Sequence, residues 1–121
     1  METTKEVGGT HYELLKMQPV ELIVKCKLTF IQGNMLKYIS RYKNKNGAED
    51  IRKCIHYAQL ATRYGDTAGY KLPLAQAYMY CRANNLTNKQ KGIITSIFQE
   101  DYYHVVKQCL KLIKTEYPDE Y

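Results

Sequence analysis

The chain has 121 residues, of which 45% are hydrophobic and 25% are charged. This length allows one domain, or one domain with a small extension, and excludes a multidomain enzyme or a complete TIM barrel. Lys and Arg number 18 against 12 for Asp and Glu, which gives a net charge of +6, and twelve tyrosines accompany two phenylalanines and no tryptophan. The core of such a small chain is modest, so we expect a homo-oligomer.

The compartment follows from what the sequence lacks. Its first residues are polar and do not resemble a signal peptide, and no apolar run approaches the roughly 20 residues that span a bilayer. The four cysteines form no C-x-x-C pair, so we expect buried free thiols, no membrane contact and a reducing cytoplasm. A zinc site that joins cysteines to His11, His56 and His104 is an alternative without the close paired spacing of zinc motifs.

The hydrophobic residues recur with a period of about 3.6, which predicts an all-α protein. We expect a compact bundle of about six short helices in a single domain. Three helices lie in a basic, motif-bearing region at residues 1–66, and three form a C-terminal extension at residues 67–121 that packs on it. We find no convincing internal repeat.

In chain order, Pro19 opens a short helix that ends near Lys27, because proline is favoured at the first helical position. Val20, Ile23 and Val24 form the apolar side of this helix.

A second helix is predicted at about 31–42, with Gly33 in its first turn, where a missing side chain permits close approach of another segment. A polar loop follows at 43–47. The apolar stripe of this helix consists of Ile31, Met35, Tyr38, Ile39 and Tyr42.

A third, longer helix is predicted at about 48–64, with Glu49 and Asp50 near its positive end. A glycine-rich break at 63–69 separates it from the second half. Its predicted buried face consists of Ile51, Cys54, Ile55, Ala58 and Ala61.

The second half begins with a helix from Pro73 to about Ala83. Thr87 and Gln90 form a capping box for the next helix, and Asp101 caps a last helix to about Glu116. We expect Asn84-Asn85 to form the C-cap of the helix that begins at Pro73. The predicted inward side chains of the first and last of these helices are Leu74, Ala77, Tyr78 and Cys81, and then Val105, Val106, Cys109, Leu110 and Ile113.

The excess positive charge is local. Between Lys25 and Lys53 lie eight basic side chains and two acidic ones, so this segment alone carries +6. A local basic excess indicates an anionic partner such as a nucleotide, a nucleic acid or an acidic surface. The alternative is a charged surface that only keeps the protein in solution.

Two polar stripes lie in this basic segment, and we expect them to converge. A short loop joins the second and third helices, which predicts antiparallel neighbours. The spacing i, i+3, i+7 places three side chains of each helix on one face. The stripes are Asn34, Lys37 and Arg41 on one helix and Asp50, Lys53 and Tyr57 on the other.

A cleft with these side chains suits a phosphorylated ligand, with Lys45 as a further cation at its mouth. Arginine binds phosphate oxygens in pairs, lysine supplies a point charge, and tyrosine stacks on a base or bonds a ribose. The alternative is structural: Asp50 pairs with Arg41 or Lys53, and the other side chains are solvated.

Known catalytic signatures are mostly absent. The sequence contains no phosphate loop, no G-x-G-x-x-G and no G-x-S-x-G. Acidic residues are few in the basic segment, so we expect no resident metal or cofactor, and Mg²⁺ would arrive with a phosphorylated ligand. Glu21 is interpreted as a partner for a helix dipole rather than as a cleft acid.

The segment from His11 to Tyr57 contains, in order, His11-Tyr12, Pro19-Val20-Glu21, Gly33-Asn34-x-x-Lys37-Tyr38-x-x-Arg41, Lys45, Gly47, Glu49-Asp50, Lys53 and Tyr57. In these motifs it resembles a phage-encoded family of small proteins of unknown function, one branch of which is similar to a short-tailed coliphage nucleotide kinase. The resemblance implies nucleotide handling in the cytoplasm of an infected bacterial host.

We therefore expect a phage protein that binds and sequesters a phosphorylated nucleotide, including a host immune signalling nucleotide, without turnover. One alternative is a nucleoside-monophosphate kinase, in which Lys37, Arg41 and Lys53 neutralise phosphates and Asp50 holds Mg²⁺. Another is a nucleic-acid-binding module. The predicted ligand-binding residues are His11, Tyr12, Asn34, Lys37, Tyr38, Arg41, Lys45, Asp50, Lys53 and Tyr57.

Overall fold

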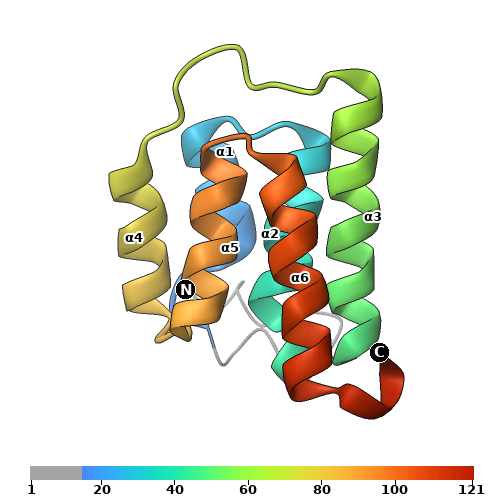
Figure 1. Ribbon diagram of the computed structural model, residues 1–121. Helices are drawn as coiled ribbons and strands as arrows, with labels where there is room; N and C mark the ends of the chain where they lie inside the picture. Colours follow the sequence, from blue (N-terminus) through green and yellow to red (C-terminus); the bar gives the residue numbers. More distant parts are fainter. Residues whose placement is uncertain (1–14) are drawn as a thin grey trace.

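A computed structural model describes residues 15–121 of the chain, and this part is all-α, as the periodicity predicts (Figure 1). Two short 3₁₀ segments, η3 (Tyr42–Asn44) and η4 (Pro118–Glu120), accompany the α-helices. The α-helices are α1 (Pro19–Cys26), α2 (Phe30–Arg41), α3 (Ala48–Tyr64), α4 (Leu74–Ala83), α5 (Asn88–Phe98) and α6 (Tyr102–Glu116).

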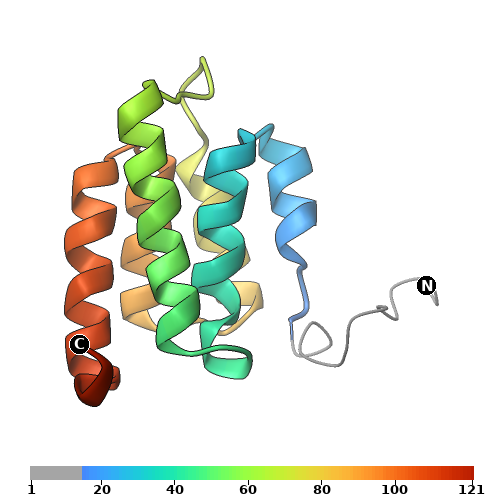
Figure 2. The same cartoon turned by 90° about the vertical axis from the view of Figure 1, so that its right-hand side faces the viewer.

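The helices form two rows of three that pack face to face. In each row, neighbours in sequence are neighbours in space, and across the rows α1 contacts α4, α2 contacts α5 and α3 contacts α6. The connection at 65–73 passes over one end of the bundle and leads from the first row to the second (Figures 1 and 2). One core cluster draws its buried side chains from both rows, with α2, α3, α5 and α6 at its centre.

The predicted starts of α1, α5 and α6 are confirmed. Pro19 is the first residue of α1, and the Glu21 carboxylate accepts a hydrogen bond from the Gln18 backbone N–H at 2.6 Å, so Glu21 caps the helix. Thr87 and Asp101 cap α5 and α6 with their side chains. Each cap satisfies backbone N–H groups that have no partner within the helix.

The inward face of α1 differs from the prediction. Val20 and Val24 are 59% and 69% exposed, whereas Pro19, Leu22 and Cys26 are buried. Both sets have helical spacing, and an eight-residue helix is too short for periodicity to choose between them. Packing against α2 selects the second set.

Two inward positions in the second half also differ. Tyr78 is 42% exposed, and Tyr80 is buried in its place, with its hydroxyl donating to Ser40 Oγ at 2.7 Å. Leu110 is 41% exposed, and Leu112 is buried on the opposite side of α6. The buried tyrosine requires a polar partner for its hydroxyl, and position 80 supplies one.

Gly33 allows the close approach that its position predicts. A Cβ atom placed there would lie 3.1 Å from the Ile23 side chain. The missing side chain therefore lets α1 pack tightly against the first turn of α2.

Two buried glutamines both cap a helix and join the two rows. Gln32 and Gln90 complete capping boxes with Thr29 and Thr87, at the starts of α2 and α5. The Gln90 Nε2 also donates to the Ile39 carbonyl of α2 at 3.0 Å. The Gln32 Nε2 donates to Glu100 at 2.7 Å and to the Tyr102 hydroxyl at 2.8 Å, at the turn between α5 and α6.

Over residues 15–121, no helix is long and apolar enough to cross a membrane.

Replacing Gln90 by leucine tests the link that this side chain makes between the two rows of helices. Gln90→Leu removes the bond to the Ile39 carbonyl and half of the capping box, so we expect a loss of about 1–3 kcal/mol in the free energy of unfolding. Urea denaturation followed by circular dichroism measures the loss. Gln59→Leu, on the exposed side of α3, is the control and should change stability by less than about 0.5 kcal/mol. Equal effects of the two substitutions would contradict the assignment.

Candidate functional site

The two predicted polar stripes come together on α2 and α3, and the ring of Tyr38 lies where they meet. Lys37 Nζ and Arg41 Cζ of α2 lie 4.6 Å and 4.9 Å from the centroid of this ring. Lys53 Nζ of α3 lies 5.3 Å from it. Each distance is within the range of a cation–π contact, so three cations from two helices converge on one half-buried ring.

A second tyrosine extends this arrangement across the helix pair. The ring of Tyr57 on α3 is stacked on Tyr38, with centroids 6.1 Å apart and an interplanar angle of 15°. We call Lys37, Tyr38, Arg41, Lys53 and Tyr57 the Tyr38 cluster.

Two further rings lie at the edge of the Tyr38 cluster. Phe30 and His56 meet Tyr57 edge to face, at centroid distances of 6.3 Å and 5.3 Å. Phe30 is 78% exposed. The surface therefore runs from an exposed aromatic edge to a group of cations, and one end can stack on a planar ring while the other attracts an anion.

Asp50 has a different place from the one predicted for a cleft acid. Its side chain is fully buried and pairs with Arg41, with Nε and Oδ2 3.3 Å apart. It also accepts hydrogen bonds from the backbone and side-chain nitrogens of Asn46. Of the two interpretations of this residue, the ion pair is the one observed. It fixes the Arg41 guanidinium and joins the loop before α3 to the end of α2.

The remaining predicted residues are less closely joined to the cluster. Asn34 turns back on its own helix and donates to the Phe30 carbonyl at 3.0 Å. Lys45 is exposed in the turn between η3 and α3. His11 and Tyr12 lie outside the described residues.

Sequence analysis missed the aromatic edge of this site. Phe30 precedes Asn34 and Tyr38 at intervals of four residues, so the three lie along one face of α2. That spacing could have placed Phe30 at the site, but the helix predicted at about 31–42 leaves Phe30 outside it, whereas α2 begins at Phe30. The cation contacts of Tyr38 were also missed, because periodicity assigns it only to the apolar stripe.

The cysteines are buried and free, as predicted. Burial raises the pKa of the Cys81 thiol to about 11. The pKa of Cys54 in α3 is raised well above its usual value by a hydrogen bond with Cys109 of α6 and by burial. The raised pKa values make the Cys54 and Cys81 thiols less acidic than a free thiol, whereas metal binding and nucleophilic attack need the thiolate. No group of three or more potential metal ligands occurs within residues 15–121.

Residues 7–59 match the model of a family described as a protein of unknown function, DUF3310. The match covers a little under half of the chain and has nearly the same extent as the resemblance found in the sequence. All five residues of the Tyr38 cluster lie inside it. No curated protein and no solved structure matches the chain.

The ion pair of Arg41 predicts a stability effect. Arg41→Ala leaves the buried Asp50 carboxylate without its cation, and we expect a loss of about 3–5 kcal/mol in the free energy of unfolding. Arg52→Ala removes an exposed pair with Glu120, 3.5 Å apart, and should cost at most about 1 kcal/mol. Thermal and urea denaturation of both variants measure the difference. A loss for Arg41→Ala no larger than that for Arg52→Ala would contradict a structural role.

Proposed function

We propose that this protein binds and sequesters a phosphorylated nucleotide at the Tyr38 cluster. The phosphate lies against Lys37 and Lys53, and the base stacks at the edge formed by Phe30 and His56. The observation that carries this proposal is the convergence of three cations from two helices on a single tyrosine ring. Stability alone gives little reason for such convergence, because cations repel one another and exposed cation–π contacts contribute only about 0.5–1 kcal/mol each.

The three cations have different roles in this proposal. Arg41 is held by the buried Asp50 carboxylate, which partly neutralises its charge and fixes its guanidinium behind the ring. Lys53 is paired with the exposed Glu49 at 3.6 Å, and an exposed pair of this kind is worth little. Lys53 therefore exchanges Glu49 for a phosphate at low cost. Lys37 supplies the second contact from the other helix.

The burial of Asp50 favours binding over phosphoryl transfer. A kinase needs a carboxylate that reaches Mg²⁺ or the acceptor hydroxyl, and this side chain is fully buried and already bonded to Arg41 and Asn46. We therefore keep the nucleoside-monophosphate kinase as the less supported alternative. Incubation with ATP, Mg²⁺ and each monophosphate tests it, and a diphosphate product would revive it.

The proposal retains the context that the family resemblance implies, a phage protein in the cytoplasm of an infected host. A host immune signalling nucleotide is then among the ligands to test, and the binding panel includes cyclic as well as linear nucleotides. The homo-oligomer also stays a prediction. Light scattering coupled to size exclusion measures it, and a monomer at all concentrations would contradict it.

Calorimetric titration with the nucleotide panel tests the binding proposal. We expect at least one nucleotide to bind more tightly than about 0.1 mM, which corresponds to −5.5 kcal/mol. Lys37→Ala and Lys53→Ala should each weaken this binding at least tenfold, because a hydrogen bond to a charged group contributes about 1.5–3 kcal/mol. Helical circular dichroism should be unchanged, since neither lysine is buried.

The control is Lys71→Ala, which removes the same charge from an exposed position in the connection between the two rows. It should leave nucleotide binding within about twofold of the unmodified protein. Equal losses for all three variants would mean that net charge alone attracts the ligand. The absence of binding by any nucleotide in the panel would remove the proposal.

A further inference from the structure

The second row of helices has a basic outer face of its own. The helices α4, α5 and α6 carry six cations against one carboxylate, that of Glu116 at the end of α6. All six cations are exposed, and none forms an ion pair with a carboxylate in the part of the chain that the structure describes. They are Arg82, Lys89, Lys91, Lys107, Lys111 and Lys114.

Most of these cations lie near one end of the bundle. A short turn joins α4 to α5, and another joins α5 to α6, so the end of α4, the start of α5 and the end of α6 share the same end (Figure 1). Arg82, Lys89 and Lys91 flank the connection between α4 and α5, and Lys111 and Lys114 lie near the C-terminal end of α6.

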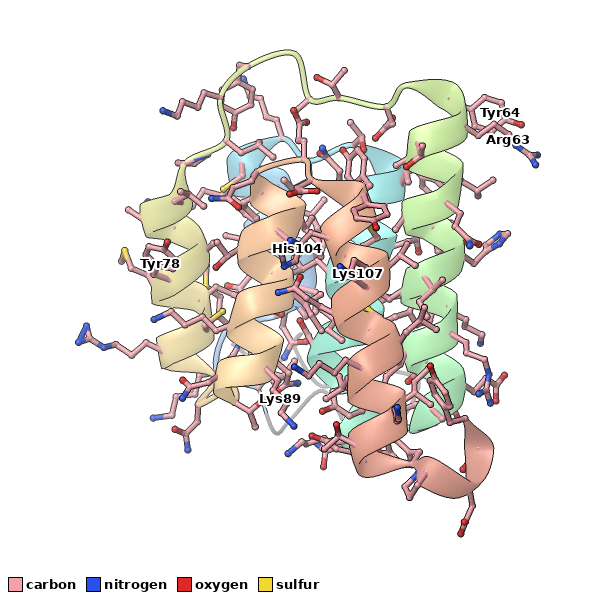
Figure 3. The ribbon with its side chains drawn as sticks, in the orientation of Figure 1. Arg63, Tyr64, Tyr78, Lys89, His104 and Lys107 are labelled. Carbon is pink, nitrogen blue, oxygen red and sulfur yellow. The ribbon has the colours of Figure 1, made fainter. Side chains whose placement is uncertain are left out.

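Exposed tyrosines lie among the lysines. Lys91 Nζ is 5.0 Å from the ring of Tyr78, and Lys107 Nζ is 5.6 Å from the ring of Tyr103. Both rings project from the outer surface, with exposed fractions of 42% and 73%. Figure 3 shows Tyr78, Lys89 and Lys107 on the face formed by α4, α5 and α6, whereas Arg63 and Tyr64 of α3 lie at the right-hand edge of the view.

An open groove of about 600 Å³ lies on the outer side of α6. Lys107, Lys111 and Lys114 line it at spacings of i, i+4 and i+7, together with the side chains of Leu110 and Tyr121. Lys114 Nζ lies 5.8 Å from the ring of Tyr121, which is 66% exposed. The groove thus combines a row of cations about 10 Å long, by the rise of an α-helix, with an aromatic ring.

Two of the three acidic residues that follow Lys114, Glu116 and Glu120, contact residues of the first row, whereas the third, Asp119, is exposed. Glu116 accepts a hydrogen bond from the Tyr42 hydroxyl at 2.9 Å, and Glu120 pairs with Arg52 of α3. Both contacts lie on the side of the first row. The six cations of the second row outnumber these acidic residues, so its outer face keeps an excess of positive charge.

We propose that this outer face of α4, α5 and α6 binds single-stranded nucleic acid. Lysines along a groove contact successive phosphates, and the interleaved tyrosines stack on unpaired bases, which is the combination that single-strand binding uses. A duplex offers no unpaired bases to Tyr78, Tyr103 and Tyr121, and an acidic polypeptide offers no planar rings for them to stack on. This site is separate from the Tyr38 cluster and does not depend on the function proposed there.

Fluorescence anisotropy with a labelled twenty-nucleotide oligothymidylate or oligouridylate, at 50 mM and 200 mM salt, tests the proposal. We expect binding that weakens steeply with salt. Lys111→Gln with Lys114→Gln should weaken binding at least tenfold at low salt. It should also reduce the slope of log K against log salt by about 1.4, since each phosphate contact on a single strand contributes about 0.7.

Two control variants separate this site from net charge and from the Tyr38 cluster. Lys25→Gln with Lys71→Gln removes the same charge from exposed positions outside both sites and should keep the strand affinity within threefold. Lys37→Ala with Lys53→Ala should also keep it, and Lys111→Gln with Lys114→Gln should leave nucleotide titrations unchanged. Circular dichroism verifies that each variant is folded.

Four results would overturn the proposal. The first is the absence of strand binding at 50 mM salt, and the second is an equal loss of strand affinity in the Lys111/Lys114 and Lys25/Lys71 double variants. The third is a loss of strand affinity in the Lys37/Lys53 double variant. The fourth is competition by polyglutamate at equal charge concentration. The last would reassign the face to an acidic protein partner.

Discussion

The fold depends on two glutamines that serve two helices at once. Gln32 and Gln90 each close a capping box at the start of a central helix, and each uses its remaining amide hydrogens on the opposite row. A fully buried amide is costly unless it is bonded, so α2 and α5 can pack only in the register that satisfies both side chains. Apolar packing alone tolerates sliding of one helix past another, whereas these directional bonds do not.

That register determines where the Tyr38 cluster lies. With α2 held against α5, α3 packs beside α2 in the same row, and the buried pair of Arg41 and Asp50 fixes how α2 and α3 align. Tyr38 and Tyr57 then meet ring against ring. The second half of the chain therefore helps to position the cations of the candidate site, even though every residue of the Tyr38 cluster lies in the first half.

Helix positions were predictable from the sequence because they depend on local signals. Pro19, Thr87 and Asp101 favour a helix start through contacts with the next few residues, independently of tertiary packing. The inward faces were predictable only in part, because helical spacing alone does not choose between neighbouring apolar positions. Val20 and Tyr78 have the spacing of core residues, but Leu22 and Tyr80 are the ones that meet the neighbouring helices. The convergence of the two polar stripes followed from the short loop between α2 and α3. The contacts on Tyr38 did not, because a ring between two helices is set by rotamers and tertiary packing.

Net charge summed along the sequence also predicts the charged surfaces of the fold only in part. The sequence assigns all of the excess positive charge to the segment from Lys25 to Lys53, because the second half is almost neutral as a sum. In the fold, the acidic and basic side chains of the second half lie in different places. Asp101 and Glu100 accept hydrogen bonds at a helix cap and a turn, while the cations lie on the outer helix surfaces. Conversely, Arg41 is partly neutralised by a buried partner. Net charge per segment therefore identifies an anion-binding surface only when the acids and bases of that segment share a face, and here only the folded chain shows which of them do.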